Sequence, residues 1–549
     1  MDGRAGARHR AHRRVRRDAD LAVLRPALRR PPVRAVLDHR HGRRDRDPLP
    51  RHQHTRLLRT AGVVRMTDVE ERLAAFVADT TADAVAATFP DEVLGQAKRA
   101  VLDTLAAMFA GGHSELAAPV LSAMRDSGPG SQVVVGTDLL TSPERAAIVN
   151  GTLAHALDFD DTVSLMPGHP SSVVLPALLA TAGHEPRRGA DVLRAYVVGH
   201  EVATKLGKAI GMEHYNKGWH STGTIGVFGA AAAVANLLGL DRVRARHALA
   251  IATSMSSGLR VGFGTMTKSL HSGWAAAAGL TAAVLAERGL TGAEHAISGP
   301  GSYFDVYGSD ASDASDLLES LGNPFTLVSP GITFKRYSCC YALHRAIDAL
   351  EHLRTEGVLG GQGVVSVAAH VPPGSMRPLP CHRPTTGLEG KFSMEYVLAV
   401  GIHDGDFGLG AFTDEAVRRP VIQNLLDTVS AVEDPACSPG DPEGRSGSAG
   451  SRGFVEVRVE LADGRTVSHR VDDAPGSPNR PLTTAELRQK FDTCWDHAGM
   501  PKHDRAVAAQ LIERLDEVDD IRVLLTLVVR GRARGWLEDG LFGTAEASA

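Results

Sequence analysis

Cysteine is scarce in this chain of 549 residues, with five in all, and no two of them form a Cys-x-x-Cys pair. A small and odd number of cysteines does not build a disulfide framework in a chain of this length. The absence of Cys-x-x-Cys also removes support for a structural zinc site or a conventional iron–sulfur cluster. We therefore expect a reduced, cytoplasmic protein.

Long hydrophobic runs are also missing. The longest apolar stretches, 226–240 and 273–286, fall short of the roughly 18–20 residues that a membrane span needs. The N-terminus has no apolar h-region of a secretory signal. The chain contains no P-loop, no G-x-G-x-x-G after a strand and no G-x-S-x-G. These absences disfavour membrane partners, nucleotide cofactors and serine hydrolysis.

Residues 1–65 lack Lys, Asn, Ile, Phe, Tyr, Trp, Ser, Glu and Cys. The segment carries nineteen Arg and six Asp, a net charge of +13, so the other 484 residues must sum to −17 to reach the total of −4. Without aromatic residues or a periodic apolar face, it cannot offset the entropy of ordering. A nucleic-acid-binding arm and a transit peptide are open readings, although the lack of Ser and the six Asp oppose the second. We expect a disordered or mis-assigned extension, because a globular pattern begins at Met66.

Helical patterns dominate 66–330 and the chain after residue 480. Asp91 after Pro90 is a candidate helix cap, and an apolar pattern of helical spacing runs from there to Gly111-Gly112. Further helices are predicted at 142–156, 173–182, 189–210, 224–238, 242–255, 273–287, 481–499, 504–515 and 521–532. Most of these segments are rich in Ala and Gly, which lets helices approach closely.

The pattern changes after Gly331. Segments 364–371 and 454–461 alternate apolar and polar residues as half-buried strands do, and the turn Asp463-Gly464 predicts a hairpin over 454–471. Helices are predicted at 340–356, 389–401 and 413–424, and a surface loop at 437–453. The sequence therefore predicts a mainly α fold with an inserted α+β domain. Its parts are the extension 1–65, a large all-helical domain made of 66–330 and 479–549, and a smaller α+β domain at 331–478, with a ligand cleft between the two domains.

The densest polar cluster is HALDFDDT at 155–162, followed by GHPSS at 168–172. Spacing alone leaves its role open. It fits a capped helix end, a Mg²⁺ or Ca²⁺ site, the Asp-x-Asp-Asp acid of a terpene cyclase, or acid/base chemistry in which carboxylates and His shift each other's pKa values. An aromatic content of 5% opposes the cyclase, whose cavities are shaped by aromatic side chains.

Two clusters combine histidine with small or cationic residues. His220 precedes a Ser-Thr-Gly turn and a small-residue helix, whose free amides suit a carboxylate, although ordinary capping explains the same residues. Lys268 and His271 lie three residues apart before an apolar helix. The chain has nine Lys against 51 Arg, which makes each Lys a candidate for a compact, titratable ammonium.

Two more clusters lie in the predicted α+β domain. Lys335 stands at its start, and Cys340 with His344 opens its first helix, either as a nucleophilic pair or as small buried residues. The other cluster is a turn-plus-helix unit that is more often a solvated surface than a site; it holds Arg383, Lys391 and Tyr396. Together the clusters suit a small polycarboxylate and proton transfer next to a carboxylate.

Six segments carry a family resemblance: NGTLAHALDFDDT, HPSSVVLPALLA, GWHSTGTIGVFGAAAAVANLLGLD, GTMTKSLHSGWAAAAGLTAAVLAERGLTG, FKRYSCCYALHRAID and GLEGKFSMEYVLA. In this order they resemble the MmgE/PrpD family, which includes 2-methylcitrate dehydratase, cis-aconitate decarboxylase and iminodisuccinate epimerase. The resemblance covers about Met66 to Trp536. It implies a large all-helical domain, a smaller α+β lid, a homodimer, and chemistry without a metal or organic cofactor.

The resemblance also implies site residues. The positions that match family motifs are Asp158, Thr162, His169, His220, Lys268, Lys335 and Tyr396. We add His271, Cys340, Arg383 and Lys391 as substrate-binding candidates. One position departs from the family, because decarboxylase-like members resemble KRFPAH where this chain reads KRYSCC, so that their His becomes Cys340. This difference opposes cis-aconitate decarboxylation, and His344, one helical turn later, is not expected to replace the missing ring. The 2-methylcitrate dehydratases also differ around this segment.

These observations predict a cofactor-independent lyase, a dehydratase or decarboxylase, acting on a small di- or tricarboxylate such as 2-methylcitrate or an aconitate-like acid. His169 or His220 would move the proton, and Asp158 would orient or charge-balance the imidazole. Lysine side chains would hold substrate carboxylates, and Tyr396 would donate to a leaving group or an enolate oxygen. An isomerase or epimerase of a dicarboxylate is the alternative. The expected partners are the substrate and a second copy of the chain, without nucleic acid or membrane.

Overall fold

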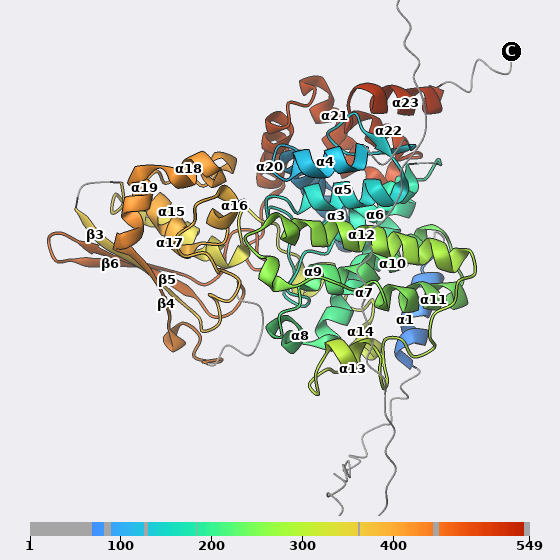
Figure 1. Ribbon diagram of the computed structural model, residues 1–549, viewed down its shortest axis with the longest axis horizontal. Coiled ribbons are helices and arrows are strands. Elements are labelled where there is room, and N and C mark those ends of the chain that lie inside the picture. The colour runs from blue at the N-terminus through green and yellow to red at the C-terminus, as the bar shows by residue number, and fades with distance from the viewer. Residues whose placement is uncertain are drawn as a thin grey trace, which may run out of the picture. The chain divides into compact units, whose positions relative to one another are not determined.

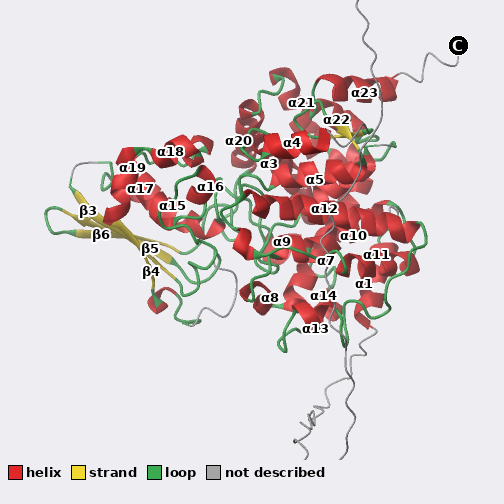
Figure 2. Cartoon of the chain, viewed as in Figure 1, coloured by secondary structure: helices red, strands yellow, loops and turns green. Residues whose placement is uncertain are grey.

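The computed structural model describes residues 68–81, 89–125, 130–183, 185–360, 363–442 and 450–542. All of them fall in one compact unit, Val63–Ala549. The predictions made for 1–65 lie outside the described residues, as does part of the predicted loop at 437–453. The described chain is mainly helical with a small sheet, as the sequence predicts (Figures 1 and 2).

The helices that precede and follow the sheet-containing segment contribute most of the larger hydrophobic cluster. These helices are α1 (Asp68–Asp79), α3 (Asp91–Gly111), α4 (Ala117–Arg125), α5 (Pro143–Ala154), α6 (Ser171–Ala182), α7 (Gly189–Ile210), α8 (Met212–Asn216), α9 (Ser221–Thr224), α10 (Gly226–Leu237), α11 (Arg242–Thr253), α12 (Met266–Glu287), α13 (Tyr303–Tyr307), α14 (Ser315–Ser320), α20 (Thr484–His497), α21 (Lys502–Glu513), α22 (Arg522–Leu527) and α23 (Gly531–Phe542). A short antiparallel pair, β1 (Gln132–Val133) and β2 (Leu140–Thr141), accompanies them.

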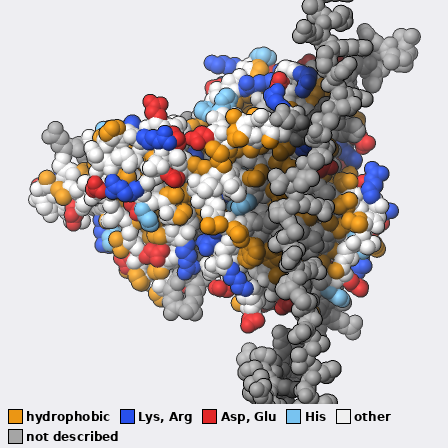
Figure 3. Space-filling model, viewed as in Figure 1, with side chains coloured by type: hydrophobic (Ala, Val, Ile, Leu, Met, Phe, Trp, Pro, Cys, Tyr) orange, Lys and Arg blue, Asp and Glu red, His pale blue; other side chains and the backbone are white. Residues whose placement is uncertain are grey.

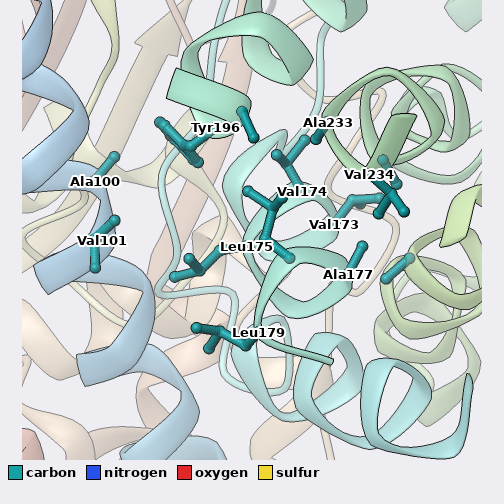
Figure 4. Packing of buried hydrophobic residues seen from close by; sticks show 14 of the residues in the cluster. Ala100, Val101, Val173, Val174, Leu175, Ala177, Leu179, Tyr196, Ala233 and Val234 are labelled. Atoms are coloured by element: carbon teal, nitrogen blue, oxygen red, sulfur yellow. The ribbon is translucent and has the colours of Figure 1, made fainter. Parts of the chain in front are cut away.

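Small residues let these helices pack at very short range. A Cβ at Gly273 of α12 would lie 2.0 Å from the carbonyl oxygen of Ile148 on α5. A Cβ at Gly199 of α7 would lie 2.5 Å from the carbonyl oxygen of Gly229 on α10. Almost every residue of α6 is buried, and Figure 4 shows its apolar side chains between those of α3 on one side and α10 on the other. Such a core has no room for added methyl groups.

The second hydrophobic cluster surrounds a four-stranded sheet of order β4-β3-β5-β6. Its strands are β3 (Val364–Val371), β4 (Val429–Glu433), β5 (Val455–Leu461) and β6 (Thr466–Val471). Strands β3 and β4 are parallel, and the other pairs are antiparallel. Helices α15 (His344–Thr355) and α17 (Met394–His403) pack on the sheet, and α16 (Gly387–Gly390), α18 (Asp414–Arg418) and α19 (Pro420–Leu425) complete this region (Figure 1).

The predicted hairpin is confirmed, since β5 and β6 pair around Asp463-Gly464 and Gly464 has a φ of +85°. Strand β4 was not predicted, because it is short and none of its residues is fully buried, so its sequence carries little of the apolar signal of a half-buried strand. The predicted helix 389–401 is wrong as one element, because α16 ends at Gly390 and Ser393 caps a new helix, α17. The predicted helix 413–424 is also two helices, since Pro420 lacks the amide that would continue α18.

Two helix starts also differ from the prediction. Helix α3 has Pro90 as its N-cap residue, and Asp91 lies in the first turn, where its charge complements the helix dipole without capping. Helix α12 begins at Met266 instead of 273, so that Lys268 and His271 lie inside it. Among the described residues, no helix combines the length and the apolar character that crossing a membrane requires.

Candidate functional site

Asp158 lies in the loop that follows α5 and is, among the described residues, the one non-glycine position with a positive φ, +52°. This left-handed conformation is uncommon and is tolerated best by Asp and Asn among residues with a side chain. The loop is held in place by Lys335, whose Nζ donates to the Asp158 carbonyl oxygen at 2.8 Å. Strained backbone of this kind is often found at functional sites.

The Asp158 carboxylate lies between two buried ammonium groups. Lys268 Nζ is 2.7 Å from Oδ1, and Lys335 Nζ is 3.0 Å from Oδ2. Burial alone would raise the pKa of the Asp158 carboxyl, but the two lysines outweigh burial and hold it well below its usual range. For Lys335, the same carboxylate overcomes the effect of burial and raises the pKa of its ammonium. Asp158 and Lys335 are therefore both charged at neutral pH.

Lys268 also contacts His155, whose Nε2 lies 2.7 Å from Nζ. An ammonium only donates, so Nε2 accepts, and the proton of His155 is on Nδ1, which donates to Asp160 at 2.9 Å. Burial lowers the pKa of His155, and Lys268 adds to this effect against the opposing charge of Asp160. The ring is a neutral link that orients Lys268.

The side chains of His155, Asp158, Asp160 and His169 lie close enough together to hold a metal ion. The ligand atoms of His155, Asp158 and Asp160 are already engaged, because Lys268 Nζ hydrogen-bonds to Asp158 and His155, and His155 Nδ1 donates to Asp160. An ammonium in that position supplies the positive charge that an ion would bring. The arrangement therefore fits a charge-balanced polar network better than a cation site.

His169 has a defined tautomer. Its Nδ1 lies 2.7 Å from the carbonyl oxygen of Asp161, which only accepts, so Nδ1 carries the proton and Nε2 has a free lone pair. Burial, reinforced by His155 and the lysines, lowers the pKa of His169 well below its usual value despite the charge of Asp160. The ring is thus neutral near pH 7 and presents a basic nitrogen, 3.5 Å from Asp158 Oδ1.

His220 pairs with another histidine. Its Nδ1 is 3.0 Å from His271 Nδ1, so one ring donates this hydrogen bond and the other accepts it. Burial lowers the pKa of His220 well below its usual value, and burial lowers that of His271 to about 4. The His220 ring stacks on His155 and meets Phe263 edge-on. His271 contacts His220 directly but does not line the cavity that His220 faces.

These side chains surround a cavity of about 70 Å³. The lining residues are Asp158, Thr162, Pro167, Gly168, His169, Tyr215, His220, Phe263, Lys268, Lys335, Cys340, Tyr341, Ala342, Pro378, Phe392 and Gly450. Thr162 donates to the Gly168 carbonyl oxygen at 3.0 Å. Burial raises the pKa of the Cys340 thiol to about 11, so Cys340 faces the cavity as a neutral group.

Two family models match most of the chain. The MmgE/PrpD N-terminal domain matches residues 71–315, and the MmgE/PrpD C-terminal domain matches residues 337–517. This chain belongs to the MmgE/PrpD family. It is 30% identical to the cis-aconitate decarboxylase of Homo sapiens, over 80% of this chain and 90% of the relative. It is 28% identical to that of Aspergillus terreus, over 80% and 92%, and 24% identical to the 2-methylcitrate dehydratase of Cupriavidus necator, over 70% and 82%.

Seven of the eleven site residues expected from the MmgE/PrpD motifs and clusters line the cavity: Asp158, Thr162, His169, His220, Lys268, Lys335 and Cys340. They come from four separate stretches of the chain, which the fold brings together around one cavity. His271 stands behind His220, as described above. The remaining three residues, Tyr396, Arg383 and Lys391, lie elsewhere.

Each of these three has a local partner. The Tyr396 hydroxyl donates to the carbonyl oxygen of Ala411, and Arg383, on the surface, pairs with Asp427 at 2.6 Å. Lys391 is buried, but its Nζ donates to the Ser338 carbonyl oxygen at 2.6 Å. Burial lowers the pKa of Lys391 to about 8. None of these three side chains lines the cavity, so none is placed to contact a substrate there.

Several residues of the site were not predicted. His155 and Asp160 belong to the HALDFDDT motif and were marked as part of its cluster, but nothing in the motif separates their roles from that of Asp158. Phe263 and Phe392 cover Lys268, whose Nζ lies 5.2 and 5.3 Å from their ring centres. Single aromatic residues of this kind carry no pattern that a sequence could reveal. Their faces stabilise the ammonium and keep the cavity wall apolar.

Proposed function

We propose that this protein is a cofactor-independent lyase that eliminates water or carbon dioxide from a small di- or tricarboxylic acid. The observation that carries the proposal is the pair of buried lysines around Asp158 beside the basic nitrogen of His169. The cavity lining contributes two ammonium groups and one carboxylate, which favours an anionic ligand. The activities named for the relatives, cis-aconitate decarboxylation and 2-methylcitrate dehydration, support the same class of chemistry.

Each lysine retains a hydrogen for the substrate. Lys268 Nζ uses two of its three N–H groups on Asp158 and His155, and Lys335 Nζ uses two on the carbonyl and carboxylate of Asp158. The third N–H of each would donate to a substrate carboxylate. Charge-assisted hydrogen bonds of this kind are short and strong in a cavity that excludes water.

The proton transfer is assigned to His169. Its Nε2 would accept the proton from the carbon next to a carboxylate that the lysines hold, and the electron pair left on that carbon would expel a β-hydroxyl. The hydroxyl would take up the proton that Nε2 has accepted and leave as water. In the decarboxylation variant no proton is abstracted: carbon dioxide leaves, and the carbanion would take up a proton from a His169 that solvent has first protonated on Nε2. A positioned base of this kind contributes about 10²–10⁴-fold in rate.

Cys340 bears on which of these reactions occurs. A neutral thiol is smaller than an imidazole and neither accepts nor donates a proton readily near pH 7. A decarboxylation that relies on a second imidazole at the position of Cys340 would lack that imidazole in this protein. We therefore favour a substrate whose reaction does not require a proton from this wall of the cavity. Both a hydroxy acid and an aconitate-like acid are candidates.

The test is turnover of a panel of citrate, 2-methylcitrate, cis-aconitate and iminodisuccinate analogues in D₂O, with and without EDTA. We expect loss of water or carbon dioxide from one of the acids, unchanged by EDTA. Loss of turnover on chelation, restored by Mg²⁺, would contradict the cofactor-free chemistry. Deuterium uptake without loss of water or carbon dioxide would instead identify an epimerase.

The segment 331–478 is proposed as a lid over this site. Cys340, Tyr341, Pro378 and Phe392 belong to it and line the cavity. Because one wall of the cavity belongs to this segment, movement of the segment would open the site to the substrate and close it again. Closure would then exclude water from the carbanion.

A homodimer is the expected assembly, and α12 offers a surface for it. Met266, Leu270 and Trp274 follow one another at four-residue spacing on this helix and are all exposed, Trp274 by 54%. Figure 3 shows hydrophobic side chains at the surface in the region of α9 and α12. An exposed apolar row suits pairing with the same row of a second copy about a two-fold axis.

Trp274→Glu is therefore expected to convert a dimer into a monomer in sedimentation velocity, because it places a charge at the centre of an apolar interface. Val523→Glu, a charge introduced at an exposed valine of α22, is the matched control and should leave the dimer intact. A wild-type monomer, or a Trp274→Glu dimer as stable as the control, would contradict this surface.

A further inference from the structure

Lys490, on helix α20, is a buried lysine that does not line the cavity of the site. Its side chain is 5% exposed, and its Nζ pairs with Asp103 of α3 at 2.6 Å. The same nitrogen donates to two carbonyl oxygens, that of Phe159 at 2.7 Å and that of Lys335 at 2.9 Å. All three hydrogens of the ammonium are therefore used within the protein.

The two carbonyl groups belong to the backbone that presents the central charges of the site. Phe159 directly follows Asp158, and the other carbonyl is that of Lys335 itself. The Lys335 side chain returns to the same loop, because its Nζ donates to the Asp158 carbonyl oxygen at 2.8 Å. Lys490 thus hydrogen-bonds to the backbone of both segments whose side chains meet in the cavity.

A second contact also joins these two segments. Thr162 and Thr333 form an isolated antiparallel bridge, with N–H to oxygen distances of 2.9 and 3.0 Å. The segment around Lys335 is neither helix nor strand, so no regular ladder sets its position. The bridge and the ammonium of Lys490 tie this segment to the Asp158 loop, and the Phe334 N–H, which donates to the Gly476 carbonyl oxygen at 3.0 Å, ties it to the chain that follows β6.

From this arrangement we infer that Lys490 is a positioning residue of the site: it holds the Asp158 loop and the Lys335 segment in register, so that the two charged side chains meet at the cavity. The inference rests on the proposed function for its kinetic consequence. Lys490 reaches the cavity only through these carbonyl groups, and a misplacement of about 1 Å at a reacting centre costs about 10²-fold in rate.

A purely stabilising ion pair between Lys490 and Asp103 is the competing explanation. Removing only Lys490 leaves the Asp103 carboxylate buried without a partner, which destabilises the fold whatever the role of Lys490. Removing both charges avoids that penalty, because a buried pair is often replaceable by apolar residues of similar volume. The double variant Lys490→Met/Asp103→Leu therefore separates stability from positioning.

The experiment compares this double variant with Lys490→Met, the wild type and Lys98→Met. Lys98 lies on α3, as Asp103 does, and pairs with Asp516 at 2.6 Å, away from the cavity lining. Lys98→Met therefore controls for the loss of a lysine–aspartate pair. We expect the double variant to unfold near the wild-type temperature yet to lose about 10²-fold in kcat/KM, mainly in kcat. Wild-type kinetics in a folded double variant would overturn the inference.

A second measurement does not depend on any activity. In a crystal structure of the double variant, the Lys335 backbone should be displaced and its Nζ should leave the Asp158 carbonyl oxygen. An unchanged Lys335–Asp158 contact would overturn the inference even if no acid of the panel is turned over. Failure of the wild type to act on any of those acids would contradict the proposed function alone. If the double variant does not fold, the same two measurements on folded Lys490→Met decide, because methionine makes neither carbonyl contact: wild-type kinetics or an unchanged Lys335–Asp158 contact would overturn the inference.

Discussion

Replacement of Asp158 by Asn is expected to abolish measurable turnover and to lower the free energy of unfolding by about 3–5 kcal/mol, the usual result of breaking a buried ion pair from one side. The carboxylate is the counter-ion of both Lys268 and Lys335, which contact it at 2.7 and 3.0 Å. Asn tolerates the positive φ at this position, so the effect reports the charge and not the backbone. Steady-state assays and urea unfolding measure the two losses.

Asp161→Asn is the matched control, because it makes the same substitution three residues later. Burial is the main cause that raises the pKa of the Asp161 carboxyl well above its usual value, against the hydrogen bonds that Ser171 donates to it. Burial thus disfavours the charged form, and we expect an amide at this position to change the unfolding free energy by less than about 1 kcal/mol. Equal losses in the two variants would show that the charge of Asp158 is not what matters.

His169→Asn is expected to reduce kcat by about 10²–10⁴-fold with little change in KM. The Asn side-chain amide is placed to donate to the Asp161 carbonyl oxygen as Nδ1 does now at 2.7 Å. What the variant lacks is the basic Nε2. Proton exchange between solvent and the substrate carbon, followed by NMR in D₂O, should be lost in parallel with turnover.

The pH dependence provides an independent test of His169. Burial holds its pKa well below the ordinary value of 6.5, so the neutral, basic form is present at pH 6.5 and is lost only when the pH falls further. The acid limb of kcat/KM should therefore lie below pH 6.5. An acid limb centred at pH 6.5 or above would contradict the assignment. His220→Asn is the companion variant: if it loses proton exchange while His169→Asn keeps it, the base is His220.

Much of the site follows from local sequence. The HALDFDDT motif, the GHPSS segment and the histidine and lysine clusters stand at loop and helix starts, where side chains are free to face a cleft. Asp158, His169, His220, Lys268, Lys335 and Cys340 indeed line one cavity. The sheet hairpin was also predictable, because an Asp-Gly turn between alternating strands is a strong local signal.

In the α+β segment, a residue's closeness to a family motif did not indicate whether its side chain lines the cavity. Tyr396 lies three residues after Ser393, which caps α17, and its hydroxyl bonds to Ala411. Which face of a helix meets the cavity depends on how the helix packs on its sheet, and a single short motif does not carry that information. Arg383 likewise lies on the surface beside Asp427, because the turn that carries it faces away from the cavity.

The sequence by itself determined the class of fold, the family and the residue types of the site, because these depend on periodicity, turn chemistry and motif spacing along the chain. Only the tertiary structure decided the protonation of the histidines, the pairing of Asp158 with two lysines and the place of Lys490. Those features depend on desolvation and on contacts between residues as far apart as Asp103 and Lys490. Both arise only when separate helices are packed together.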